Sequence, residues 1–381
     1  MKKIAVITGN RADYGIYYPI LKTILAHSNL ELFLIVTGSH LSPDFGNTID
    51  EILRDGFNIK AKVDMLPDDD TGAAMAKSLG KGIIGITKAL ELIQPNILLI
   101  LGDRGEMMAG AIAGAHMNIV VAHIHGGEVS GTIDESLRHA ITKLSHIHLV
   151  ATNKSAKRII KLGEQKNMVF VVGAPRLDTI LNQKLIEPSI IAKKFNLDLS
   201  RPILLAVQHP VTTEINEAAW QMKQTMQALK KLSLQTILML PNSDAGGQAM
   251  IKIIKEFKDC SFINSFSSLP HLEYLSLMKI AKVMVGNSSS GIIEAPSFHL
   301  PVVNIGTRQQ GRQCSNNIIN VKYNKVEIIK AINKALFDEN FRKRIKNCKN
   351  PYGDGKASSI IVKILNKIKI TPNLLQKKLT Y

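Results

Sequence analysis

Acid and base side chains gather in the first half of the 381-residue chain, where short apolar runs end. Asp103 follows the apolar run of LILGDRGE. His125 and Glu128 follow the run of IVVAHIHGGE, and Asp134 comes shortly after them. Carboxylates and imidazoles at neighbouring strand ends can remove and return protons beside a leaving group. We therefore predict an acid–base site, with ordinary helix caps and buried ion pairs as the alternative.

A second segment, VMVGNSSSGIIEAP, predicts a strand, a glycine- and serine-rich turn and the start of a helix. A helix N-terminus offers unpaired N–H groups and the positive end of its dipole. Small residues let a diphosphate approach, and Ser288, Ser289 and Ser290 add hydroxyl donors. Helix capping, the alternative, needs only one serine, so an anion site is favoured. The chain lacks GxxxxGK[ST], and GNR at 9–11 is not GxGxxG, so neither a Walker A loop nor NAD binding is predicted.

Basic side chains that could pair with such a phosphate lie at the ends of other apolar runs. They are Arg11, His209, Arg308 and Arg312, and Arg104 in GDRGE is a further predicted substrate-binding residue. Arginine suits bidentate pairing with phosphate. Each arginine taken alone is more often part of a surface ion pair.

Metal and disulfide chemistry are not predicted. In a strand, His123 and His125 would point to the same face, but no spacing specifies a third ligand. Cys260, Cys314 and Cys348 lie far apart and form no CxxC, which disfavours a zinc site or a disulfide framework. Three further histidines of the region are expected to be structural: His139, His146 and His148.

The elements that must position these residues form two series of short apolar runs. The first runs from KIAVIT to MVFVVG and the second from PILLAVQHP to VVNIG, with stretches of helical spacing between the runs. This alternation predicts parallel sheets covered on both faces. We predict two Rossmann-like, doubly wound α/β domains over 1–175 and 176–355, then a helix and tail over 356–381 that could pack on either domain. Ligands of such sheets bind at the carboxyl ends of strands.

Composition excludes several classes. Hydrophobic residues make up 45% and charged residues 21%, a globular balance. No apolar run reaches the ~18 residues of a membrane span, and the apolar part of MKKIAVITGN is too short for a signal peptide, so we predict a cytoplasmic protein. The net charge is +17, but 14 lysines and arginines against four acids fall after residue 324, on helical patterns. Solvated helix faces explain this excess better than nucleic-acid binding.

Several of these motifs resemble those of the hydrolysing UDP-N-acetylglucosamine 2-epimerases of sialic acid synthesis. The resemblance covers nearly the whole chain and rests on GNRADYG, VTGSHL, GDRGE, HIHGGEVSGTIDES, QHPVTTE, GNSSSGIIEAP, NIGTRQQGR and YGDGKA. It implies a GT-B fold with the site in the interdomain cleft. It also implies elimination of UDP, hydration of a glycal-like intermediate, release of N-acetylmannosamine, no cofactor, and a homodimer or homotetramer. The animal members continue into a kinase domain, and no kinase activity is expected here.

The resemblance also assigns roles to residues. Asp103 and Asp134 match positions implicated in proton transfer, and His40 matches a position lining the sugar site. The positions expected around UDP are Arg11, His209, Ser288, Ser289, Glu294 (on the ribose) and Arg308, with Asn242 as a further contact.

One departure from the family pattern is His125, where animal and some bacterial members have a carboxylate. A neutral imidazole can still move a proton, because histidine titrates near pH ~6.5. The change is compatible with a different sugar, since related enzymes act on UDP-N,N′-diacetylbacillosamine. The motifs also allow a GT-B glycosyltransferase, which does not need the acid–base cluster, a non-hydrolysing epimerase, which GGEVSGTIDES fits less well, and a binding protein without turnover.

Overall fold

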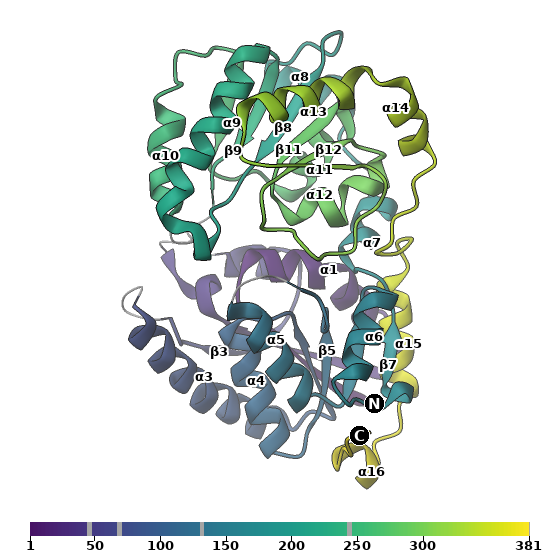
Figure 1. Ribbon diagram of the computed structural model, residues 1–381. Coiled ribbons are helices and arrows are strands. Elements are labelled where there is room, and N and C mark those ends of the chain that lie inside the picture. The colour runs from purple at the N-terminus through teal and green to yellow at the C-terminus, as the bar shows by residue number, and fades with distance from the viewer. Residues whose placement is uncertain (44–47, 67–70, 130–132, 242–245, 381) are drawn as a thin grey trace. The chain divides into compact units, whose positions relative to one another are not determined.

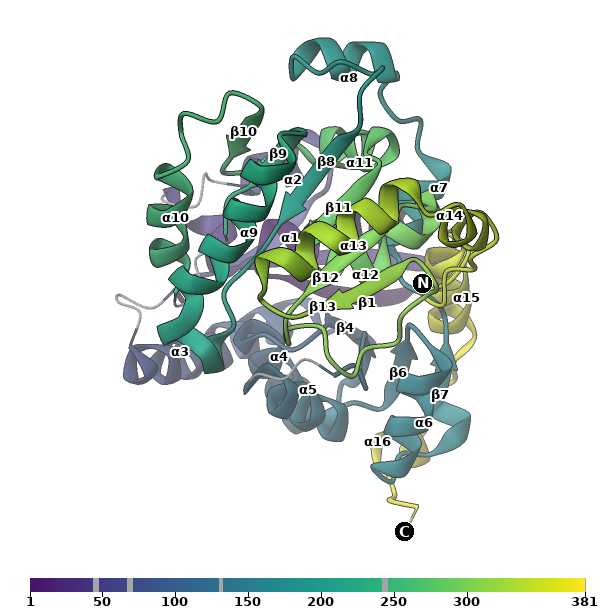
Figure 2. The same ribbon diagram turned by 45° about the horizontal axis from the view of Figure 1, so that its top comes forward.

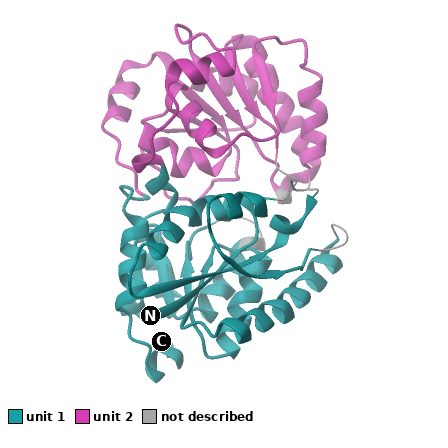
Figure 3. Ribbon diagram, turned by 180° about the vertical axis from the view of Figure 1, so that it is seen from behind, with its two compact units in different colours: residues 1–129, 133–179, 352–381 teal, residues 130–132, 180–351 magenta. Residues whose placement is uncertain are grey.

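The computed structural model describes residues 1–43, 48–66, 71–129, 133–241 and 246–380. They fold into two compact units, shown in different colours in Figure 3. Unit 1 is made of Met1–Val129, Ile133–Thr179 and Tyr352–Tyr381, and unit 2 contains Ile180–Pro351. Among the helices of these described residues, none is both long and apolar enough to cross a lipid bilayer.

Unit 1 is built on a parallel sheet whose strands follow the order β3-β2-β1-β4-β5-β6-β7. Ladder pairs such as Ile4 with Leu32 on one side and with Ile97 on the other place β1 between β2 and β4. Its strands are β1 (Lys2–Thr8), β2 (Leu30–Thr37), β3 (Ile59–Val63), β4 (Ile97–Leu101), β5 (Val120–Ile124), β6 (Ile147–Val150) and β7 (Val169–Val171).

Helices cover both faces of this sheet (Figure 1). Alternate residues of β1 point to opposite faces, so Ile4 and Val6 join one core while Ala5 and Ile7 join the other. The first core includes α1 (Arg11–Leu25), α2 (Ile49–Arg54) and α15 (Ala357–Lys367), and the second includes α3 (Gly72–Ile93), α4 (Gly105–His116) and α5 (Ile133–Leu144). Further helices are α6 (Asn153–Lys161), α7 (Arg176–Asn182), which crosses into unit 2, and α16 (Pro372–Leu375).

Unit 2 repeats this plan with a parallel sheet in the order β10-β9-β8-β11-β12-β13. Helices α9 and α13 lie together over one face of it (Figures 1 and 2). Its strands are β8 (Ile203–Val207), β9 (Gln235–Met239), β10 (Ile263–Phe266), β11 (Val283–Gly286), β12 (Val302–Ile305) and β13 (Ile318–Val321). Its helices are α8 (Pro188–Lys194), α9 (Ala218–Leu232), α10 (Gly247–Lys255), α11 (His271–Ile280), α12 (Ser289–Ile293), α13 (Lys325–Phe337) and α14 (Glu339–Lys346). The predicted pair of doubly wound α/β folds is confirmed.

The C-terminal helix α15 packs in unit 1, which answers the question that the sequence left open. Ile361, Val362 and Leu365 of α15 are buried in the same core as α1. Lys2 Nζ donates hydrogen bonds of 2.8 Å to the carbonyls of Leu365, Asn366 and Ile368, at the end of this helix. The first strand and the last long helix are therefore tied together by one lysine, because helix C-termini leave carbonyls without partners.

A close backbone approach in unit 2 explains one glycine. Gly286, the last residue of β11, has φ of +128°, and a Cβ placed there would come within 2.1 Å of the Val207 carbonyl oxygen. No side chain fits in that space, so only glycine lets β8 and β11 end side by side.

We expect Gly286→Ala to lower the free energy of unfolding by more than about 2 kcal/mol, because the added methyl meets rigid backbone. The control is Gly80→Ala in the exposed interior of α3, where an added Cβ has no atom within 4 Å. This change should stabilise by about 0.5–1 kcal/mol through helix propensity. Urea unfolding followed by circular dichroism measures both, and an unchanged midpoint for Gly286→Ala would contradict the packing argument.

Candidate active site

Several of the predicted site residues lie at the points where strand order reverses in each sheet. The reversal falls between β1 and β4 in unit 1 and between β8 and β11 in unit 2. Connections to opposite faces leave the carboxyl ends of these strands open, and ligands of doubly wound sheets bind there. The residues that directly follow these four strands include Arg11 after β1, Asp103 and Arg104 after β4, His209 after β8, and Ser288, Ser289 and Ser290 after β11.

In unit 1, Asp103 is held by an arginine of helix α5. The Arg138 guanidinium forms an ion pair with the Asp103 carboxylate and donates a hydrogen bond of 2.8 Å to the Glu128 carbonyl oxygen. Arg138 is only 5% exposed, so water does not compete for its donors. One side chain thus joins the loop after β4 to the loop after β5. The sequence prediction assigned no role to Arg138, because its position in a helical pattern carries no separate signal.

His125 and Glu128 form a pair in the loop after β5. His125 Nδ1 lies 2.6 Å from Glu128 Oε1, and Glu128 is 8% exposed. A carboxylate on Nδ1 holds a proton on that nitrogen, so Nε2 is the nitrogen that could exchange a proton with a substrate. The backbone of His125 is left-handed, with φ of +61°. This conformation re-aims the side chain away from the strand's alternation.

The condition under which His123 and His125 would point to the same face, that both lie in one strand, is not met. Strand β5 ends at Ile124, so the alternation that would align the two rings stops before His125. His123 is buried, and its Nε2 donates a hydrogen bond of 2.7 Å to the Gly102 carbonyl oxygen. Burial lowers the pKa of His123 to about 3. The neutral His123 ring therefore supports the loop after β4.

Two predicted residues cannot be placed. Asn242 lies outside the described residues. Asp134 belongs to the first turn of α5, but its side chain is outside the described part of the chain. Both stay predictions from the sequence.

Asp13 is a carboxylate at the same sheet edge that sequence reasoning missed. Its side chain accepts a 2.7 Å hydrogen bond from Asn10 Nδ2, while Asn10 caps α1 through the Asp13 backbone N–H. Burial raises the pKa of Asp13 to about 7; Arg104 opposes this rise, and the carboxylates of Glu106 and Asp103 add to it. A carboxyl group that titrates near neutral pH beside other acids is typical of active sites. The signal was present in GNRADYG but could not be separated from a helix cap.

His40 and Arg11 both have protein partners. His40 is fully buried, with Nε2 3.0 Å from Thr8 Oγ1 and Nδ1 2.7 Å from Thr48 Oγ1, and burial lowers its pKa to about 4. Any part of His40 in a sugar site is therefore indirect, through its threonine partners. Arg11 is exposed and pairs with Glu51 at 3.1 Å between Nε and Oε2. This pair is the surface ion pair that the sequence analysis gave as the alternative to phosphate binding.

In unit 2, one buried asparagine fixes the loops around the predicted phosphate site. Asn287 Oδ1 accepts a 2.7 Å hydrogen bond from the His209 backbone N–H, and its Nδ2 donates to the His209 carbonyl at 2.8 Å. Its own carbonyl accepts hydrogen bonds from Arg308 at 3.3 Å and from Gln309 at 2.8 Å. Asn287 thus joins the ends of β8 and β11 to the loop after β12. Sequence reasoning placed this asparagine in its motif without giving it a function.

The serine turn at Ser288, Ser289 and Ser290 agrees with the helix-capping alternative at one of its residues. Ser288 is the N-cap of α12 and accepts a 3.3 Å hydrogen bond from the Ser290 backbone N–H, as helix capping requires. Helix α12 has only five residues, so few peptide dipoles align behind the turn. Ser289, Ser290 and Arg312 are partly buried, and Glu294 at the end of α12 is 3% exposed. Their contacts with a nucleotide stay predictions.

Comparison with known proteins identifies the class. The family model described as UDP-N-acetylglucosamine 2-epimerase matches residues 22–366. The chain therefore belongs to the UDP-N-acetylglucosamine 2-epimerase family, as its motifs predicted.

Individual relatives agree with this assignment. The chain is 40% identical to the UDP-N,N′-diacetylbacillosamine 2-epimerase (hydrolyzing) of Legionella pneumophila, over 99% of each chain. It is 37% identical to a UDP-N-acetylglucosamine 2-epimerase of Neisseria meningitidis, over 88% of each chain. Its fold is similar to the crystal structure of UDP-GlcNAc 2-epimerase from Neisseria meningitidis bound to UDP-GlcNAc, with a TM-score of 0.82 at 18% identity over 97% of this chain and 100% of that one. The predicted GT-B type of fold is confirmed.

The raised pKa of Asp13 predicts a dependence of stability on pH. Above pH ~4 the unfolded chain loses this proton while the folded state keeps it, so folding is penalised increasingly up to pH ~7. We expect Asp13→Asn, which cannot ionise, to be more stable than the wild type at pH 8 by on the order of 2–4 kcal/mol. The difference should shrink towards pH 4.

Urea unfolding at pH 4.5, 6 and 8 measures this difference. Asp259→Asn, at an exposed position, is the control for loss of one acidic side chain. A stability difference for Asp13→Asn that stays constant across this range would contradict the burial argument.

Proposed function

We propose that this protein is a hydrolysing 2-epimerase of a UDP-linked 2-acetamido sugar. It converts the nucleotide sugar and water into UDP and the free sugar inverted at carbon 2. The observation that carries the proposal is the set of acid and base groups at one sheet edge of unit 1, around Asp103, His125 and Glu128, in a chain of this family. A transferase that only moves the sugar does not need this set.

The reaction has two stages. A base removes the proton from carbon 2, the electron pair forms a carbon 1–carbon 2 double bond, and the bond from carbon 1 to the phosphate oxygen breaks, so UDP leaves with those electrons. Water then adds its hydroxyl to carbon 1, and a proton returns to carbon 2 from the opposite face. Proton transfer of this kind contributes about 10²–10⁴-fold to a rate. No nicotinamide or metal takes part in these steps as proposed.

The residues divide between the two units by chemistry. The acid and base groups of unit 1 exchange the protons: Asp103, His125, Glu128 and Asp134. The unit 2 residues bind the nucleotide, with Glu294 on the ribose and the others around the diphosphate and base: His209, Asn242, Ser288, Ser289, Ser290, Arg308 and Arg312. Arg11 and Arg104 complete the substrate-binding set as the family resemblance implies, and His40 supports it through Thr8 and Thr48. The same resemblance supports a cytoplasmic homodimer or homotetramer.

Two substrates fit this proposal. UDP-N-acetylglucosamine is supported by the family description and by the relative from Neisseria meningitidis. UDP-N,N′-diacetylbacillosamine is supported by the 40% identity to the hydrolysing enzyme of Legionella pneumophila over 99% of both chains. His125, where animal and some bacterial members have a carboxylate, is a difference compatible with such a change of sugar.

Incubation with each nucleotide sugar in deuterium oxide, followed by NMR, tests the proposal. We expect UDP and a free sugar that is inverted at carbon 2 and carries deuterium there, because that proton comes from solvent. The nucleotide that turns over faster identifies the preferred sugar. Release of UDP without deuterium at carbon 2 would contradict the elimination mechanism, and turnover only in the presence of an acceptor would favour a glycosyltransferase.

Two substitutions separate the roles of the units. Asp103→Asn should reduce kcat at least about 100-fold while the Kd of UDP stays within about twofold, because the nucleotide is bound by other residues. Arg308→Ala should weaken UDP binding about 10- to 100-fold through loss of a charge-assisted hydrogen bond. Calorimetric titration with UDP and steady-state kinetics measure the two effects. Equal loss of binding and turnover in Asp103→Asn would rule out a purely catalytic role.

A further inference from the structure

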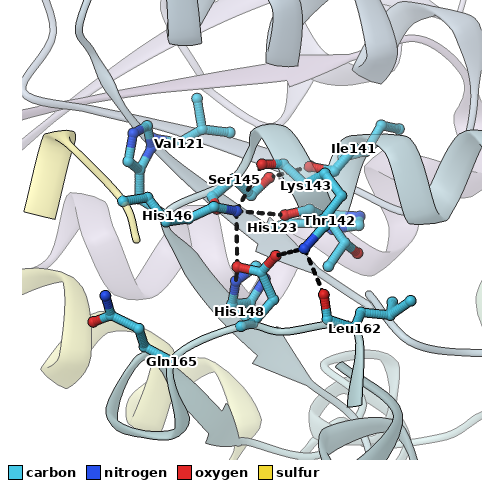
Figure 4. Close-up of polar contacts among 12 residues, drawn as sticks. Val121, His123, Ile141, Thr142, Lys143, Ser145, His146, His148, Leu162 and Gln165 are labelled. Atoms are coloured by element: carbon cyan, nitrogen blue, oxygen red, sulfur yellow. Dashed lines mark hydrogen bonds and ion pairs between the residues drawn. The ribbon is translucent and has the colours of Figure 1, made fainter. Parts of the chain in front are cut away.

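The C-terminal end of helix α5 is bound by a lysine from the last residues of the described chain. Lys377 Nζ donates hydrogen bonds to the carbonyl oxygens of Thr142 at 3.3 Å, Lys143 at 2.6 Å and Ser145 at 2.9 Å. These three acceptor residues are labelled in Figure 4. The last carbonyls of a helix have no partners within it, and a cation there also interacts favourably with the helix dipole. Lys377 therefore acts as a cap that comes from a distant segment of the chain.

A buried carboxylate fixes this lysine. Glu164 is 1% exposed, and its Oε2 lies 2.7 Å from Lys377 Nζ and 3.1 Å from His148 Nε2. Its Oε1 lies 3.1 Å from Lys143 Nζ, so α5 contributes a second cation from its own last turn. Burial alone would raise the pKa of Glu164, but the hydrogen bonds from His148 and Lys377 outweigh it and lower the pKa to about 2. The carboxylate is charged at any working pH, and the two lysines compensate that charge.

The same helix carries the arginine that holds Asp103. Thr142, whose carbonyl receives Lys377, donates its hydroxyl to the Arg138 carbonyl at 3.0 Å. Arg138 then reaches Asp103 and the Glu128 backbone. At 1.5 Å of rise per residue, the capped carbonyls lie only about 6–10 Å along the helix from Arg138. Arg138 is thus within two turns of the capped end, so a shift or fraying of that end would move Arg138.

We propose that Lys377 is a positioning residue for the acid–base site, an inference that rests on the proposed function. It holds α5 at the axial position and rotation at which Arg138 engages Asp103. Lys377 belongs to unit 1, whereas most of the residues proposed to bind UDP belong to unit 2. Its loss therefore affects the chemical step and not the binding of the nucleotide.

The test compares two substitutions. Lys377→Met keeps a side chain of similar length but removes its hydrogen-bond donors and charge. Lys378→Met removes the same charge from an exposed neighbour. We expect Lys377→Met to reduce kcat about 10- to 100-fold, with KM and the Kd of UDP within about twofold of the wild type. Lys378→Met should match the wild type, and Lys377→Arg, which restores donors and charge, should recover most of the turnover. Hydrogen exchange of the α5 amides, read by mass spectrometry, should rise in Lys377→Met alone.

Three outcomes would overturn the proposal. The first is a kcat for Lys377→Met equal to that of Lys378→Met, whatever the exchange shows. The second is a parallel loss of UDP affinity, which would indicate a general structural defect. The third is unchanged exchange in α5. If the wild type turns over no UDP-sugar, the proposed function fails, and hydrogen exchange alone then decides whether Lys377 holds α5.

Discussion

Reversal of strand order in a parallel sheet determines which backbone groups stay open to a ligand. In unit 1, α1 follows β1 on one face and α4 follows β4 on the other, so neither helix covers the carboxyl ends of these two strands. Unit 2 has the same reversal between β8 and β11. The polar loops of each unit converge at this edge, and the helices on both faces keep the sheets rigid beneath them. Every proposed role depends on this placement.

Buried and partly buried charges of unit 1 are stabilised by specific partners. Desolvation of an ion costs several kcal/mol, and the cost is recovered only with good geometry and full hydrogen bonding. Asp103 has Arg138, and Glu164 has Lys143, His148 and Lys377. Asp13 instead keeps its proton up to about neutral pH, because burial outweighs the attraction of Arg104. One cluster thus combines a carboxylate held by an arginine with a carboxyl group poised to titrate.

Much of the fold could be predicted because strands buried on both faces of a parallel sheet have continuous apolar runs in the sequence. KIAVIT, NILLILGD and IVVAHIHGG became β1, β4 and β5, and the polar residues after them lie at the expected sheet edge. Local patterns could not reveal Arg138, Asn287 or Lys377, since their roles come from partners distant in sequence. The sequence also could not show that the strand ends before His125, because a left-handed residue directly after a strand leaves no signature in the alternation.

Unit 1 is interrupted in sequence, since its core is completed only by α15 after the whole of Ile180–Pro351. A ribosome adds about 5–20 residues per second, so the apolar face of α1 waits roughly 17–66 s during synthesis before α15 is made and covers it. Unit 2 is contiguous over that stretch and can close on itself in the meantime. Unit 2 can therefore complete its fold before unit 1, although synthesis of unit 1 begins first. During this interval the nascent chain exposes the apolar surface of α1 that α15 later buries, and this surface is the kind that chaperones bind.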